Sequence, residues 1–200
     1  GLPQPSSEFY TTFPPFLYVI VGPDKSRTLS DLLGSTFLSS RDPETESRNL
    51  NALQHFIYDH ETAHALHDLA ENQTSEEKEK AEKERLRSLS RNSPFIFEIH
   101  ETNFRERVAD VYAAFRLAAQ GGEDIIPSLA SYRTLNLAVK KDILHYTSSA
   151  LRRTADDAAS GKLPSSPHAM FERALEIARA CPLDPKDVQT EIETFKMPSL

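Results

Sequence analysis

The chain has 200 residues, of which 38% are hydrophobic, so it can form one domain with a hydrophobic core but not two large ones. The formal net charge is −7, and the basic residues form no patch interleaved with aromatic residues, so we expect no nucleic acid among the partners. The longest apolar run, residues 16–21, is far shorter than the roughly 20 residues that span a bilayer. We therefore expect a single soluble domain over residues 1–200, without a membrane span.

Residues 1–15 are rich in proline and serine, and we expect them to form a flexible N-terminal segment. Because the chain starts with Gly1 instead of methionine, removal of a signal peptide or an anchor is one explanation of its start. Export to the periplasm or the outside is therefore the expectation, with the cytoplasm as the alternative. The single Cys181 cannot form an internal disulfide and leaves the redox compartment undecided.

Residues 16–21 are aromatic and β-branched and end at a Gly-Pro turn, which predicts one short strand near the N-terminus. The edge of this strand could pair with an extended substrate, and a buried core strand is the alternative. Residues 28–38 are expected to form a short helix with its leucines inward.

A long helix is predicted over residues 46–72, because apolar residues recur there at spacings of three and four. The apolar face, which includes Leu53 and Phe56, continues into His60 and His64. Both imidazoles should therefore point into the fold.

His60 and His64 belong to a His-Glu-x-x-His motif whose spacing suits a metal ion. They lie one helical turn apart, roughly 6 Å along the axis, so both can bind one ion. Glu61 is rotated by about 100° from His60, where it can reach a water on the metal without being a ligand. His67 lies about 10.5 Å along the axis from His60, too far to be a third ligand, and is expected near the site or at the surface.

Residues 72–92 contain a dense run of glutamate, lysine and arginine. Pairs four residues apart, such as Glu76 with Lys80, support a solvated helix, and Leu86 and Leu89 are almost its only apolar positions. We expect an exposed charged helical arm, with a protein-binding surface as the alternative.

A second long helix should begin at the Ser-Pro pair of residues 93–94 and end at the Gly-Gly pair of residues 121–122. Residues 95–99 fit either its first turns or a short strand. Glu106 and Asp110 lie one turn apart in this helix. One carboxylate could therefore bind a metal while the other orients a ligating histidine.

The two motifs together resemble the gluzincin metallopeptidases, and among them the catalytic core of the zinc proteases related to the CAAX prenyl proteases. Members of that group pair His-Glu-x-x-His with a later Glu-x-x-Ala-Asp, and this chain has Glu-Arg-Val-Ala-Asp ending at Asp110. The resemblance implies Zn²⁺ held by His60, His64 and Glu106. It also implies Glu61 as general base and Asp110 as the partner of His60. The prenyl proteases are membrane-embedded, so no isoprenylated substrate is implied.

The remaining chain predicts further helices: one or two over residues 128–154, one over 166–180 and one over 185–195. Tyr146 belongs to the inward set of the first of these. No internal repeat is visible. The predicted fold class is therefore mainly α, a zincin-like helical domain with a small β element near the N-terminus.

A donor that stabilises the oxyanion usually supplements the zinc. The related proteases carry a Ser-His-Pro segment that ends in Glu-Arg, and residues 166–173 read Ser-Pro-His-Ala-Met-Phe-Glu-Arg, with the His and Pro exchanged. The resemblance implies His168 as a catalytic donor in the first turn of a helix, with Arg173 holding local structure or a carboxylate. The alternatives are a plain helix start with a surface histidine, or His145 with Tyr146 as the donor pair; those two residues could also simply be packing.

The sequence thus predicts a zinc-dependent peptidase that hydrolyses peptide bonds in a peptide or protein substrate, with Glu61 as the base. The alternative is a catalytically inactive or regulatory zincin-like helical protein that binds a protein partner through the charged arm. A regulatory protease that cleaves a single partner is a third interpretation. Nothing in the sequence indicates the oligomeric state or the cleavage preference.

Overall fold

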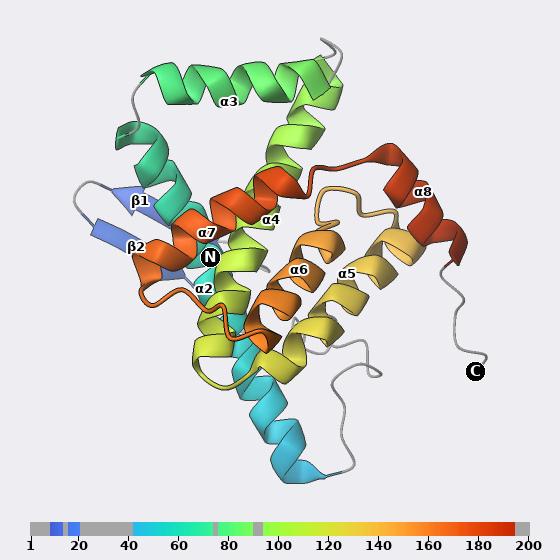
Figure 1. Ribbon diagram of the computed structural model, residues 1–200. Helices are drawn as coiled ribbons and strands as arrows, with labels where there is room; N and C mark the ends of the chain where they lie inside the picture. Colours follow the sequence, from blue (N-terminus) through green and yellow to red (C-terminus); the bar gives the residue numbers. More distant parts are fainter. Residues whose placement is uncertain (1–8, 14–15, 21–41, 74–75, 90–93, 195–200) are drawn as a thin grey trace, which may run out of the picture.

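A computed structural model describes residues 9–13, 16–20, 42–73, 76–89 and 94–194 of the chain. Helices make up most of these residues, so the predicted mainly α fold is confirmed (Figure 1). The helix expected over residues 28–38 lies outside the described residues.

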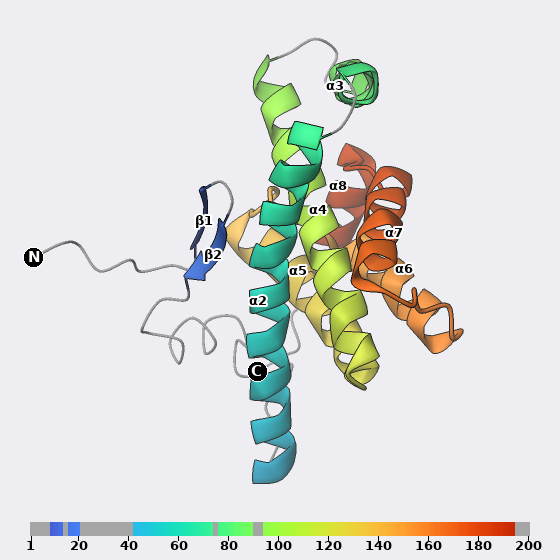
Figure 2. The ribbon, with the colours of Figure 1, turned by 90° about the vertical axis from the view of Figure 1, so that its left-hand side faces the viewer.

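Two long helices form the centre of the fold. The helix α2 (Pro43–Gln73) lies alongside α4 (Pro94–Ala119), and Figure 2 shows α4 between α2 and the later helices. Residues 107–115 of α4 are all buried. A helix that is covered on all sides belongs in the core of a fold, and α4 is that helix here. Residues 95–99, which the sequence left undecided, are its first turns.

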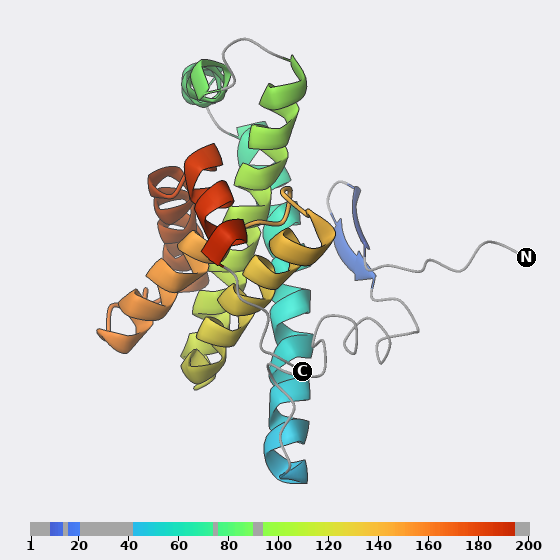
Figure 3. The ribbon, with the colours of Figure 1, turned by 90° about the vertical axis from the view of Figure 1, so that its right-hand side faces the viewer.

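The later helices cover the face of α4 that α2 leaves open (Figures 2 and 3). They follow a short 3₁₀ turn, η2 (Glu123–Ile125). In chain order they are α5 (Ile126–Lys140), α6 (Ser148–Ala159), α7 (Pro167–Ala180) and α8 (Pro185–Thr194). The predicted stretch of residues 128–154 is therefore two helices. A loop of residues 141–147, here called the site loop, connects them.

The charged arm is helical but attached to the core. The helix α3 (Glu76–Leu89) crosses one end of the α2–α4 pair (Figure 1). Leu86 is only 3% exposed and belongs to the same apolar cluster as Phe104 of α4. The guanidinium of Arg85 lies 5.6 Å from the centroid of the Phe104 ring. Leu86 thus packs this largely charged helix against the core of the fold.

A small β element is present near the N-terminus, as predicted, but it contains two strands. The strand β2 (Phe16–Ile20) pairs in antiparallel fashion with β1 (Phe9–Phe13), with Phe9 opposite Ile20 and Phe13 opposite Phe16. The hairpin lies beside α2 (Figure 3). The strand β1 falls within residues 1–15, the segment that the sequence analysis expected to be flexible. The run Phe-Tyr-Thr-Thr-Phe favours a strand, but the proline and serine around it obscured that preference.

Candidate metal centre

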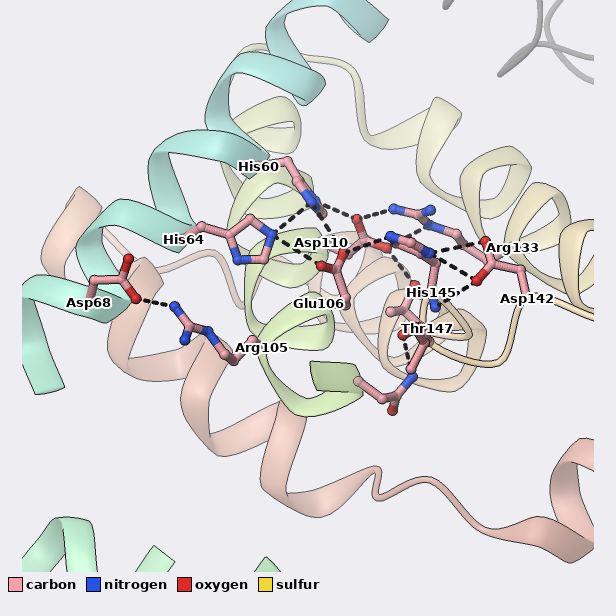
Figure 4. Close-up of polar contacts among 12 residues, drawn as sticks. His60, His64, Asp68, Arg105, Glu106, Asp110, Arg133, Asp142, His145 and Thr147 are labelled. Atoms are coloured by element: carbon pink, nitrogen blue, oxygen red, sulfur yellow. Dashed lines mark hydrogen bonds and ion pairs between the residues drawn. The ribbon is translucent and has the colours of Figure 1, made fainter. Parts of the chain in front are cut away.

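The two motifs meet where α2 and α4 face each other. His60 and His64 are each 9% exposed, and they continue a buried stripe of α2 that includes Leu53 and Phe56. Glu106 reaches them from α4 (Figure 4). The hydrophobic periodicity of α2 thus carries the two imidazoles into the helix interface, as the sequence predicted.

The potential ligand atoms are close enough to share one ion. The Nε2 atoms of His60 and His64 lie 3.1 Å apart, and each is 3.4 Å from an oxygen of the Glu106 carboxylate. Atoms about 2.0–2.1 Å from one ion at tetrahedral angles lie roughly 3.3 Å from each other. The buried Oε2 of Glu106 has no hydrogen-bond partner among the described residues. The donor set therefore fits a divalent metal.

Asp110 determines which nitrogen of His60 faces the cluster. Its Oδ1 lies 2.8 Å from Nδ1 of His60, on the side of the ring opposite Nε2. A proton on Nδ1 satisfies this hydrogen bond and leaves the lone pair of Nε2 available to a metal. Asp110 is thus placed to orient a ligating imidazole without binding the metal itself.

The close contacts between histidines and carboxylates shift the pKa values of the cluster strongly. Burial opposes a charge on His60, yet its hydrogen bond with Asp110 and its ion-pair contact with the Glu106 carboxylate raise its pKa to about 10. Burial likewise opposes ionisation of Glu106, but contacts with His60 and His64 hold its pKa well below the usual range. The same negative charges that stabilise a proton on His60 would stabilise a metal cation in its place.

Two residues that the sequence analysis did not identify hold Asp110. Arg133 of α5 donates from Nε and Nη2 to the two Asp110 oxygens, at 2.8 and 2.7 Å, and the Thr147 hydroxyl donates to Oδ2. Burial disfavours the carboxylate, but the Arg133 charge and the His60 contact lower the pKa of Asp110. Neither residue belongs to a local motif, so no signal in the sequence marked them.

Glu61 stands beside the ligand set without belonging to it. It is half-buried next to His60, and the three convergent ligands do not include it. Burial raises the pKa of Glu61, while the neighbouring His60 and His64 oppose that shift. A carboxylate with a raised pKa is a better proton acceptor near neutral pH than an exposed one.

His145 is the histidine outside α2 that faces the cluster (Figure 4). Its Nε2 lies 3.7 Å from Oε2 of Glu106, and its Nδ1 lies 2.9 and 3.0 Å from the two oxygens of Asp142. The hydrogen bond with Asp142 raises the pKa of His145, with burial opposing the shift. The site loop therefore brings a hydrogen-bond donor to the edge of the candidate centre.

The other expected site residues lie elsewhere. His168 is exposed in the first turn of α7, where Ser166 caps the helix, and it is not one of the three convergent ligands. Arg173 pairs with Asp157 of α6 at 2.7 Å. The Tyr146 side chain belongs to an apolar cluster formed by α5, α8 and the chain before α8.

His67 is buried, not exposed on the surface of α2. Its ring packs edge-on against Phe104 and Phe171, at centroid distances of 5.8 and 6.3 Å. Burial, reinforced by the charge of Arg105, lowers the pKa of His67 to about 4. As the spacing predicted, it is not one of the convergent ligands.

Comparison with protein-family models, with curated proteins and with solved structures finds no match for this chain. The likeness to gluzincins therefore rests on the two motifs. Among the described residues, none of the helices combines the length and the apolar character needed to cross a membrane.

Proposed function

We propose that this protein is a zinc-dependent peptidase that hydrolyses peptide bonds in peptides or proteins. The observation that carries the proposal is the convergence of His60, His64 and Glu106, whose ligand atoms all lie within 4.8 Å of one another. Three protein ligands that leave a position open for water are the usual set of a catalytic zinc. Two histidines and a carboxylate also suit iron(II), so the identity of the metal is part of the test.

The residues around the cluster have separate tasks in this proposal. Bound zinc would lower the pKa of a water and polarise the scissile carbonyl. Glu61 accepts a proton from the attacking water and passes it to the leaving amine. Asp110, held by Arg133, keeps His60 in the tautomer that presents Nε2.

His145 would assist the same reaction from the site loop. Its Nε2 points toward the Glu106 carboxylate, while Asp142 accepts a hydrogen bond from Nδ1. Because Nδ1 donates to Asp142, Nε2 carries a proton in the imidazolium form, and this N–H can stabilise negative charge as it develops on the carbonyl oxygen. We assign this task to His145 in preference to His168, which is exposed on α7.

The test compares the wild-type protein with Glu61→Gln and His64→Ala. Metal analysis after exhaustive dialysis should give about one equivalent of zinc for wild type and Glu61→Gln and much less for His64→Ala. Of these three proteins, only the wild type should cleave a peptide library efficiently, because His64→Ala lacks the metal and loss of the general base in Glu61→Gln costs about 10²–10⁴-fold in rate. His55→Ala, at an exposed position of α2, is the matched control and should behave as wild type.

Each result that contradicts the proposal points to a different alternative. Bound iron in place of zinc would redirect the proposal to oxidative chemistry. Zinc-loaded wild type that cleaves no peptide would favour the inactive or regulatory interpretation, in which the protein binds a partner. Equal cleavage by Glu61→Gln would reject Glu61 as the base.

A further inference from the structure

The site loop is tied to α4 by one amide side chain. Asn103 is fully buried, and its Nδ2 lies 3.1, 2.8 and 3.0 Å from the carbonyl oxygens of Ile143, Leu144 and Tyr146. Three backbone acceptors within four residues thus converge on one amide group. Loops normally satisfy such carbonyls with water or with their own turns, so this convergence fixes the shape of the loop from outside.

The orientation of the Asn103 amide is itself fixed. Arg107, one turn further along α4 and 2% exposed, donates from Nη1 to Oδ1 of Asn103. The Nε of Arg107 donates to the carbonyl oxygen of Ala178 in α7, at 3.2 Å. A guanidinium has only donors, so the oxygen of the amide must face Arg107 and its NH₂ group must face the loop.

The loop is attached at its middle and at its C-terminal end to the face of α4 that carries the proposed ligand. Asn103, Glu106 and Asp110 follow one another at spacings of three and four residues, which places them on one side of the helix. Asn103 binds the middle of the loop, and Asp110 accepts from Thr147 at its end. His145 lies between these two attachments, with Nε2 3.7 Å from Glu106.

We propose that Asn103 is a positioning residue, which holds the backbone of the site loop so that the His145 imidazole stays at the edge of the metal cluster. This inference rests on the proposed function, because it gives Asn103 a role in hydrolysis through His145. Asn103 itself binds neither the metal nor the substrate. Asn103 would thus support hydrolysis from a position 42 residues before His145 in the chain.

Asn103→Asp is the most informative variant. It keeps an oxygen for Arg107 and the size of the side chain, but it presents a carboxylate oxygen instead of an NH₂ group to three carbonyls. Amide exchange of residues 143–146, measured on the metal-free protein, should accelerate at least tenfold, because the loop loses its anchor. In the metal-loaded protein, kcat should fall by roughly 10–100-fold with KM retained, since displacement of a catalytic group by about 1 Å is that costly.

Thr154→Val is the matched control. Thr154 is fully buried, and its hydroxyl donates within α6 to the Ala150 carbonyl oxygen at 2.9 Å. This variant also loses a buried hydrogen bond, but it does not touch the site loop. It should leave both the exchange of residues 143–146 and kcat unchanged.

A double-mutant cycle separates positioning from general destabilisation. If Asn103 acts through His145, adding Asn103→Asp to His145→Ala should lower kcat no further. Equal losses in both backgrounds would overturn the proposal, as would an unchanged loop exchange in Asn103→Asp. Absence of hydrolysis in the wild type would instead reject the proposed function, and the exchange experiment would still decide whether Asn103 anchors the loop.

Discussion

The Nδ1 atom of His60 lies 2.8 Å from Oδ1 of Asp110, so a hydrogen bond joins the two helices that carry the proposed ligands. Asp110 is completely buried and also accepts from Arg133 and Thr147. The orientation of one imidazole thus depends on residues from α4, α5 and the site loop. A site of this kind is built by the tertiary fold and not by one helix alone.

Asp110→Asn should weaken metal binding while leaving all three ligands in place. An uncharged amide is a poorer acceptor for Nδ1 of His60, and loss of such a partner typically costs 10–100-fold in metal affinity. Competition with a chromophoric chelator measures the dissociation constant.

The matched control for this variant is Asp157→Asn. Asp157 is also buried, at 3% exposure, and pairs with Arg173 away from the candidate centre. Both variants should be destabilised, because each leaves an arginine with a weaker partner. Only Asp110→Asn should lose metal affinity, and an equal affinity in the two variants would contradict the role given to Asp110.

The parts of the site that the sequence predicted are those encoded within one helix. A spacing of four residues brings His60 near His64 and Glu106 near Asp110 in any straight helix. The apolar stripe of α2 also indicated which way the histidines face. Local periodicity likewise sufficed for the mainly α fold and for the start of α7 at its serine cap.

The parts that the sequence did not predict depend on contacts between distant segments. Arg133 follows Asp110 by 23 residues, and Thr147 follows it by 37. Asn103 meets the site loop at separations of 40 to 43 residues. None of these contacts leaves a periodic pattern in the sequence. The assignment of His168 rested on a short motif match alone, without a helical spacing that would bring it near the ligands.

Leu86→Ala should destabilise the protein, although it lies in the most charged helix. Its side chain is buried in the cluster that joins α3 to α4, and removal of a buried leucine side chain costs about 2–5 kcal/mol. Urea unfolding followed by circular dichroism measures the change in the free energy of unfolding. Leu163→Ala, at a site that is 37% exposed, is the control and should change it by less than about 0.5 kcal/mol. A Leu86→Ala variant as stable as wild type would mean that α3 is a free arm.

The two histidines considered as oxyanion donors should respond differently to substitution. His145 lies 3.7 Å from the Glu106 carboxylate and is held by Asp142, whereas His168 is exposed in the first turn of α7. Loss of one such donor usually lowers kcat by about 10²–10³-fold. We expect that loss in His145→Ala, with zinc content and thermal stability retained, and no change in His168→Ala.

Steady-state kinetics on the best substrate from the peptide library gives kcat and KM for both variants. His145→Ala should lower kcat while KM changes little, because the donor acts on charge that develops only in the transition state. Asp142→Asn should show a smaller loss in the same direction, since it weakens the hydrogen bond that orients the His145 ring. A large loss in His168→Ala together with a normal His145→Ala would move the donor to α7, and it would require α7 to approach the cluster when substrate binds.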